Sequence, residues 1–161
     1  MLTPLVLLAA ATATAAETGP TPPSRYMHGF RVGYSYINGA EDHARLSSPH
    51  LFVMGYEATQ RISGGEWLNV ITVQNIMVAG MNQSVFIPSG NFLLGFEMNE
   101  RVQVGVGPNI SPFSEPDDII HMIAAVGYTP EAGDFNVPVH LSYVPDVDGN
   151  YRIAVTTGVN W

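Results

Sequence analysis

The sequence predicts an all-β domain in which eight antiparallel strands, joined up and down, close into a barrel. Beyond residue 25, apolar and polar residues alternate with a period of two in one segment after another. Gly, Pro, Asn and Asp separate these segments, and no stretch repeats apolar residues at helical spacing. A chain of 161 residues is long enough for one such domain but not for two cores.

The first residues are predicted to be an export signal. An apolar run at 5–11 precedes Ala13-Thr14-Ala15, which has the small-x-small form of a signal peptidase site. The run is well short of the ~20 apolar residues that a spanning helix needs, so a cleaved signal is favoured over an anchor. We therefore assign residues 1–16 to a signal peptide, 17–25 to a linker and 26–161 to the barrel.

The first four predicted strands cover residues 30–36, 52–61, 67–79 and 91–98. Three of them place large apolar side chains on one face, as Phe30 and Val32 do, and Arg, Glu, Gly or Ser on the other. The segment 67–79 defines no face, because its polar residues fall at both parities. These residues are Asn69, Thr72, Gln74 and Asn75.

The last four predicted strands cover residues 101–109, 120–128, 135–144 and 151–161. The final segment alternates most clearly, with apolar and aromatic residues on one face and small or polar residues on the other. The first face holds Tyr151, Ile153, Val155, Thr157, Val159 and Trp161, and the second holds Arg152, Ala154, Thr156, Gly158 and Asn160. The preceding segment places Phe135 and Leu141 opposite His140 and Ser142.

The predicted connections are short and long in turn. Tight turns are expected at 63–65, 98–100 and 131–133, and longer polar loops at 38–48 and 110–118. Two shorter connections, at 81–83 and 145–150, fall on the side of the long loops. An even strand count puts both termini at the end with tight turns, which for an exported barrel is the periplasmic side.

Composition excludes several classes of function. The net charge is −8 and the chain has no Lys, so a basic face for nucleic acid is not expected. It has no Cys, which excludes disulfides and thiolate chemistry. Charged residues make up only 12% of the chain against 46% hydrophobic residues. So low a charge fits a surface that faces lipid.

The strand faces that carry charge also carry many Gly and Ala residues. An eight-stranded barrel is just wide enough for side chains to fill, so small residues would make room for large polar ones inside it. We therefore expect an interior polar network and a lipid-facing apolar surface. Its members are Arg31, Glu57, Arg61, Glu97, Arg101, His121, His140 and Arg152. The alternative is a soluble barrel or sandwich with the apolar face inside.

The last eleven residues resemble the C-terminal assembly signal of bacterial outer-membrane proteins, in which an aromatic residue ends the chain and alternate upstream positions are hydrophobic. The matching residues are Tyr151, Ile153, Val155, Val159 and Trp161. A wider resemblance, to small eight-stranded outer-membrane barrels, extends over residues 26–161. Together these resemblances imply an outer-membrane location, contact with outer-membrane lipid and recognition by the barrel assembly machinery.

His140-Leu141-Ser142 looks like the His-x-Ser of the lipid A 3-O-deacylases, some of the enzymes built on barrels of this size. That resemblance implies a His that activates a Ser, oriented by a Glu from the final strand. This chain has Gly149-Asn150-Tyr151 in the corresponding stretch, where only Asp146 or Asp148 could substitute. We therefore expect His140 and Ser142 to join the interior network instead of forming a catalytic site.

No metal or cofactor site is predicted. His121 and His140 fall on inward faces of neighbouring strands, but two ligands without a third leave a site incomplete. The acidic segments 114–118 and 146–150 lack a full calcium-loop signature.

Three functional hypotheses remain open. The leading one is a non-enzymatic outer-membrane barrel with a structural role, or with surface partners bound through its loops. The others are an outer-membrane enzyme acting on lipid A, and a soluble periplasmic barrel that binds a ligand inside. A wide transport pore is not expected from eight strands.

Overall fold

A computed structural model describes residues 26–40, 45–112, 119–146 and 149–161. The predicted signal peptide and linker lie outside the described residues. So do His43, Glu115, Asp117, Asp118 and Asp148.

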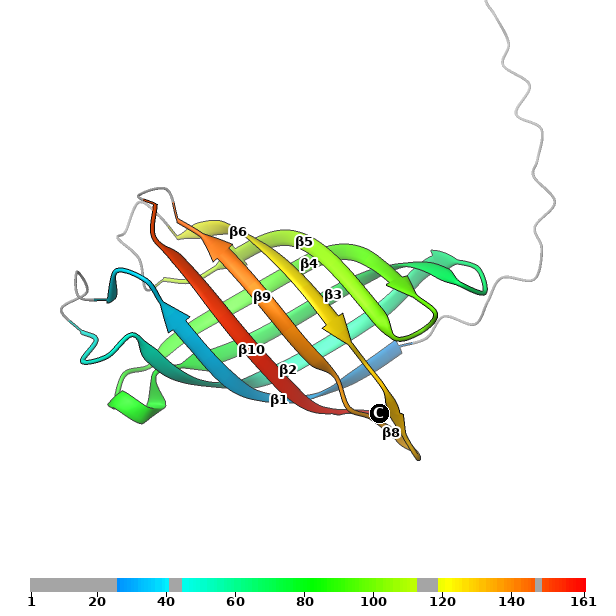
Figure 1. Cartoon of the computed structure of the whole chain (residues 1–161), viewed down its shortest axis with the longest axis horizontal. Helices are drawn as coiled ribbons and strands as arrows, with labels where there is room; N and C mark the ends of the chain where they lie inside the picture. The colour runs from blue at the N-terminus through cyan, green and yellow to red at the C-terminus, as the bar shows by residue number, and fades with distance from the viewer. Residues whose placement is uncertain (1–25, 41–44, 113–118, 147–148) are drawn as a thin grey trace, which may run out of the picture.

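Eight long antiparallel strands form a closed barrel (Figure 1), which confirms the predicted fold class. They are β1 (Tyr26–Ile37), β2 (His50–Gly64), β3 (Leu68–Ala79), β4 (Ile87–Met98), β5 (Val102–Ile110), β6 (Ile120–Tyr128), β9 (Val139–Pro145) and β10 (Tyr151–Asn160). Each strand pairs with the next in this series, and β10 pairs with β1 from Gly29↔Asn160 to Ile37↔Arg152. Closure leaves no unpaired edge strand.

Alternation sorts the side chains as the sequence predicts. Odd-numbered residues point inward on β1 to β6, and even-numbered ones on β9 and β10, so Arg31 and Asn160 are buried whereas Phe30 and Val159 are exposed. The strand β3, for which the sequence defined no face, follows the same odd parity. It carries polar residues on both sides, because Asn69 is buried inside and Gln74 is exposed outside.

The predicted strand 135–144 is interrupted at Val137 and Pro138, and forms two separate strands. Val139–Pro145 is the long strand β9 of the barrel, while β7 (Glu131–Ala132) and β8 (Phe135–Asn136) form a small hairpin at the barrel rim (Figure 1). The strand β8 still pairs with β10, at Asn136↔Asn160. Pro138 interrupts the ladder with β10 because it has no N–H to donate, and Val137 N donates to Pro130 O at 2.9 Å. The hairpin turns at Gly133, whose φ of +68° a side chain would strain.

One end of the barrel carries both chain termini of the domain and, besides that hairpin, the two tightest connections; we call it the turn end (Figure 1). Between β4 and β5, Asn99 and Glu100 both adopt positive φ, and Arg101 N donates to Met98 O at 3.1 Å. This is the geometry of a type I′ turn, whose twist matches that of the strands it joins.

The opposite end, the loop end, carries the other connections, including the one-turn 3₁₀ helix η2 (Met81–Gln83). Its side chains continue the pairing of β2 where β3 has ended. Asn82 accepts from Phe52 N at 2.9 Å, and Gln83 accepts from Ser47 N at 2.9 Å and Ser48 N at 3.0 Å. Gln83 also donates to His50 O at 2.7 Å. We call this arrangement the loop clip.

No helix in the described part of the chain is long and apolar enough to cross a membrane.

Candidate functional site: the barrel interior

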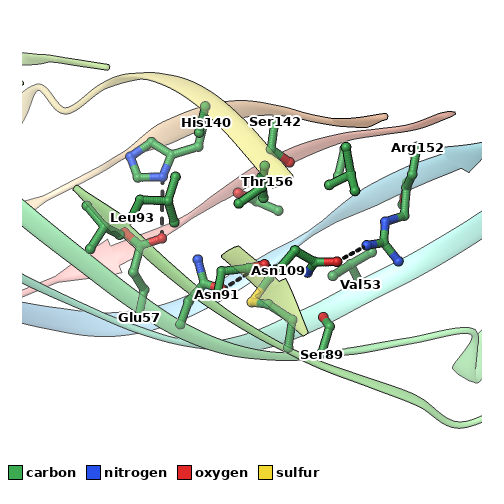
Figure 2. Close-up of a pocket in the computed structure, with 18 of the residues that line it drawn as sticks. Val53, Glu57, Ser89, Asn91, Leu93, Asn109, His140, Ser142, Arg152 and Thr156 are labelled. Carbon is green, nitrogen blue, oxygen red and sulfur yellow. Dashed lines mark hydrogen bonds and ion pairs between the residues drawn. The ribbon is translucent and has the colours of Figure 1, made fainter. Parts of the chain in front are cut away.

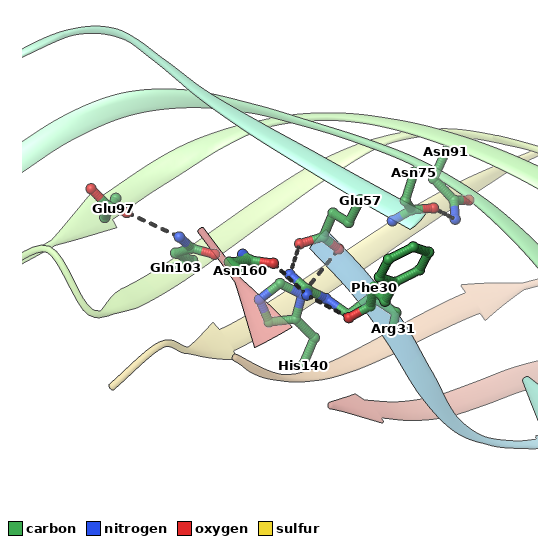
Figure 3. Close-up of polar contacts among 9 residues, drawn as sticks. All are labelled: Phe30, Arg31, Glu57, Asn75, Asn91, Glu97, Gln103, His140 and Asn160. Carbon is green, nitrogen blue, oxygen red and sulfur yellow. Dashed lines mark hydrogen bonds and ion pairs between the residues drawn. The ribbon is translucent and has the colours of Figure 1, made fainter. Parts of the chain in front are cut away.

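The first interior cluster joins β1, β2, β9 and β10 around a buried ion pair. Arg31 Nη2 lies 2.5 Å from Glu57 Oε1, and Arg31 Nη1 donates to Asn160 Oδ1 at 2.7 Å (Figure 3). On its other side, Glu57 Oε2 lies 3.4 Å from His140 Nδ1. The Arg31 side chain is fully buried, so the pair depends on these contacts in place of water.

Small residues make the room that this cluster occupies. A Cβ on Gly127 would lie 2.3 Å from Cδ2 of the His140 ring. A Cβ on Gly158 would lie 1.8 Å from Phe30 O and 3.1 Å from Arg31 Nη1. Gly127 is therefore sterically required by the His140 side chain, whereas Gly158 is required first by the backbone of Phe30 and then by the Arg31 side chain.

A second cluster lies nearer the turn end, between β2, β4 and β5. Arg61 Nη2 lies 2.7 Å from Glu97 Oε1 and 3.2 Å from Glu100 Oε1, and Gln103 donates to Glu97 Oε2 at 2.9 Å. Glu97 and Arg61 are buried, whereas Glu100 lies in the turn and is half exposed. Together the two clusters place four of the predicted network residues in two ion pairs.

Two predicted network members lie elsewhere. Arg101 is exposed in the β4–β5 turn and not inside, because β4 ends at Met98 and β5 begins at Val102. His121 does point inward, but it is level with Asn109, whereas His140 is level with Gly127 on the same strand as His121. Six residue steps of about 3.3 Å separate these levels, so the two histidines are not neighbours.

A chain of side-chain hydrogen bonds crosses the interior from Arg152 on β10 to Asn91 on β4 (Figure 2) and on to Asn75 on β3 (Figure 3). Arg152 Nη2 donates to Asn109 Oδ1 at 2.5 Å, Asn109 Nδ2 donates to Asn91 Oδ1, and Asn91 Nδ2 donates to Asn75 Oδ1 at 2.5 Å. The two middle amides each accept one bond and donate the next. A cation at the head of such a chain polarises every bond after it. We call this row the amide chain.

Two apolar clusters complete the interior. Leu93, Ile123 and Val144 pack together at mid-barrel, and Ile37, Leu51 and Ile87 pack with Ala40 at the loop end. Between them lies a cavity of about 100 Å³. Its polar lining includes Ser89, Asn109, Ser142, Arg152 and Thr156, with Asn91 at its wall (Figure 2). Most of the lining is nonetheless apolar, from side chains such as Val73, Leu93 and Ile123.

The cavity places Ser142 and His140 on one inward face, but no hydrogen bond joins their side chains among the described residues. His140 Nδ1 faces Glu57, and His140 Nε2 is buried and has no partner. Nucleophilic catalysis by Ser requires a base within hydrogen-bond reach of the hydroxyl, and this contact is absent here. The acidic group that would orient the His140 ring is Glu57 and not Asp146. Glu57 is already paired with Arg31.

No group of three or more His, Asp or Glu residues is placed to hold a metal ion within the described ranges.

The outer wall differs sharply from the interior. No outward position of the eight barrel strands holds Asp, Glu, Lys or Arg. Aromatic side chains instead gather at both ends of the wall. At the turn end, His28 lies with its ring centroid 5.0 Å from Trp161 and 5.8 Å from Tyr56. At the loop end, the corresponding distances are 5.5 Å between Tyr36 and His50 and 5.9 Å between Tyr143 and Tyr151.

The predicted assembly-signal residues line this wall. Val155, Val159 and Trp161 are 48%, 42% and 46% exposed, and Ile153 points the same way. Trp161 follows β10 and exchanges two backbone hydrogen bonds with His28, at 3.1 and 3.2 Å. The terminal aromatic residue therefore helps to close the barrel at the turn end.

Sequence reasoning did not identify the amide chain, Gln103 or Asn160 as interior partners. Asn75, Asn91 and Asn109 lie on consecutive strands and pair directly, Asn75↔Asn91 and Asn91↔Asn109. An Asn at an inward position on each of three successive strands was the available signal. That these three Asn side chains contact one another can be inferred only once the strand register is known.

No protein-family model and no curated protein sequence matches the chain. A comparison with solved structures finds similarity to the Yersinia pestis outer membrane protein Ail in a phospholipid bilayer nanodisc. The TM-score is 0.47 and the sequence identity is 14%, over 85% of this chain and 100% of that one.

Proposed function

We propose that the chain is an integral outer-membrane barrel without enzymatic activity, which acts structurally or through surface contacts at its loop end. The observation that carries this proposal is the distribution of charge. Arg31, Arg61, Glu57, Glu97 and Arg152 all point inward, and the outward positions of the eight strands hold no charged residue. Charge inside and apolar side chains outside is the polarity of a membrane barrel and the reverse of a soluble one.

The height of the outer wall supports the same proposal. Ten residue steps along β1 separate Tyr26 from Tyr36. At about 3.3 Å per residue and a strand tilt of about 40°, this is about 25 Å along the barrel axis. The aromatic groups at the two ends are thus separated by the height of the apolar band of outer-membrane barrels, where aromatic side chains lie at the headgroups.

The interior supports a non-enzymatic role. The cavity between the side chains of the lumen is about 100 Å³, which is too small for a lipid substrate. Ser142 lacks the contact with a base that acyl transfer requires. The loop end is the part left free for partners, and the loop clip holds residues 47–52 in place there.

Membrane fractionation and gel mobility test the proposal. The mature chain is expected in the outer-membrane fraction, to resist extraction by carbonate, and to migrate faster in detergent gels when unheated than when boiled. Recovery as a soluble periplasmic protein with a single heat-independent band would overturn the proposal and favour the soluble ligand-binding barrel.

A further inference from the structure

The outer wall has a hollow where it would otherwise be a smooth apolar band. It spans β2 to β5 and has a volume of about 400 Å³. Its lining is almost entirely apolar and consists of Tyr56, Ala58, Gln74, Ile76, Gly90, Phe92, Pro108 and Ile110, with Asn75 and Asn91 behind.

Small residues produce the hollow and large ones border it. Gly90 lies between Ile76 on β3 and Ile110 on β5, and a Cβ built on it would meet nothing closer than Asn75 O at 4.0 Å. With Gly90 at its side, the Ile76 side chain stands clear of the wall at 72% exposure. A protruding residue beside an empty space is a shape that a second, identical surface can fill.

Gln74 adds a polar group to this apolar hollow. It is exposed, it lies near the middle of β3, and no hydrogen bond joins its side chain to any described residue. The other outward amide on the eight barrel strands, Gln60, lies opposite Tyr26 at the turn end, where headgroups and water are near. At mid-wall an unpaired amide faces hydrocarbon, which is costly.

We propose that this hollow is the interface through which two copies of the chain associate in the membrane, with the two Gln74 amides paired across a two-fold axis. This inference rests on the proposed membrane location. An amide carries both a donor and an acceptor, so an identical amide satisfies it, whereas an acyl chain fills the space but offers no hydrogen bond. A two-fold axis along the membrane normal brings the same patch of each copy together.

Association in detergent and in vesicles tests the proposal through two variants of the mature chain. Gln74→Leu removes the amide pair and is expected to weaken dimerisation at least about tenfold. Gly90→Leu fills the hollow and is expected to abolish dimerisation. The monomer should accommodate the new side chain, because Gly90 has open space beside it and no positive φ. Val126→Leu, an outward change on β6, is the matched control and should leave the dimer intact. Native mass spectrometry gives the masses.

A crosslinking experiment locates the interface in the bilayer. The chain has no Cys, so Ala58→Cys, beside the intact Gln74, gives a single thiol at the hollow, and Leu141→Cys gives one on the opposite wall. A short bis-maleimide is expected to produce dimers from the first and not from the second.

The outcomes separate the two proposals. A protein that is absent from the membrane fraction overturns the location and the dimer together. A membrane-inserted, heat-modifiable protein that stays monomeric at all protein-to-lipid ratios overturns the dimer alone. A dimer that survives both Gln74→Leu and Gly90→Leu also overturns the proposed interface. A monomer that binds a phospholipid, and loses it in Gly90→Leu, overturns the dimer as well.

Discussion

The two halves of the barrel interior are filled by different chemistry. Towards the turn end, Arg31–Glu57 and Arg61–Glu97 are buried ion pairs, each supported by a further polar side chain. Towards the loop end, neutral amides headed by one Arg run between apolar clusters, beside a cavity whose lining extends to Glu57, Gln103 and His140. The turn half is therefore cross-braced by charge and the loop half by weaker bonds.

This difference teaches where rigidity and freedom lie. A buried ion pair contributes little net stability when it forms, but it resists the loss of either partner because the remaining charge is left without water. Neutral amides leave a smaller penalty when one is removed. Changes in the turn half should accordingly destabilise the whole barrel, and changes in the loop half should act more weakly.

The largest effect is expected from breaking one ion pair. Arg31→Met leaves the carboxylate of Glu57 buried beside His140 alone, which should cost about 3–5 kcal/mol of unfolding free energy. Urea unfolding in phospholipid vesicles measures it. The double variant Arg31→Met/Glu57→Met should recover most of the loss. A single variant as stable as the wild type would show that the turn half is not braced by charge.

A smaller effect is expected from interrupting the amide chain. Asn91→Leu removes the middle amide and leaves the donor of Asn109 and the acceptor of Asn75 without their partner, at a cost of about 1–3 kcal/mol. The same unfolding experiment measures it. A loss as large as that of Arg31→Met would contradict the contrast between the two halves.

The loop clip should affect local and not global stability. Gln83→Ala removes bonds to Ser47, Ser48 and His50, all near the surface, so the unfolding free energy should change by less than about 1 kcal/mol. Limited proteolysis after residue 40 should become faster. The conservative Gln83→Glu keeps the acceptor for Ser47 N and should be intermediate. Unchanged proteolysis in Gln83→Ala would show that the clip does not hold the loop.

The smallest effect is expected at the two residues that resemble a deacylase motif. Ser142→Ala lines the cavity with a methyl group and should alter neither stability nor the lipid A of cells that express the protein, as read by mass spectrometry. A wild-type chain that removes an acyl chain from lipid A while Ser142→Ala does not would contradict the non-enzymatic proposal.

Sequence patterns predicted most of the fold because a period of two records directly which side chains share a face. They did not predict the face of β3, since Asn69 and Gln74 are polar on opposite sides. Parity alone also misplaced Arg101, because it does not say where a strand stops and a turn begins. The segment 135–144 was predicted as one unbroken strand since Phe135 and Val137 continue the alternation, while Pro138 interrupts the backbone pairing.

The interior was predictable in kind but not in detail. Inward parity identified Arg31, Glu57, Arg61, Glu97 and Arg152 from the sequence. Which of them pair depends on register and on the radius of the closed barrel, neither of which the alternation encodes. The single expected network is in fact two ion-pair clusters and an amide chain.

The apolar face of the barrel is claimed to meet lipid, and spin labels on β9 and β10 test this claim most directly. Because the chain has no Cys, labels can be placed singly at Leu141, Ser142, Val155 and Thr156. In vesicles, labels at Leu141 and Val155 should be accessible to oxygen and not to a water-soluble nickel complex. Labels at Ser142 and Thr156, which point inward, should not show this accessibility to oxygen. High nickel accessibility at Leu141 and Val155 would contradict the claim.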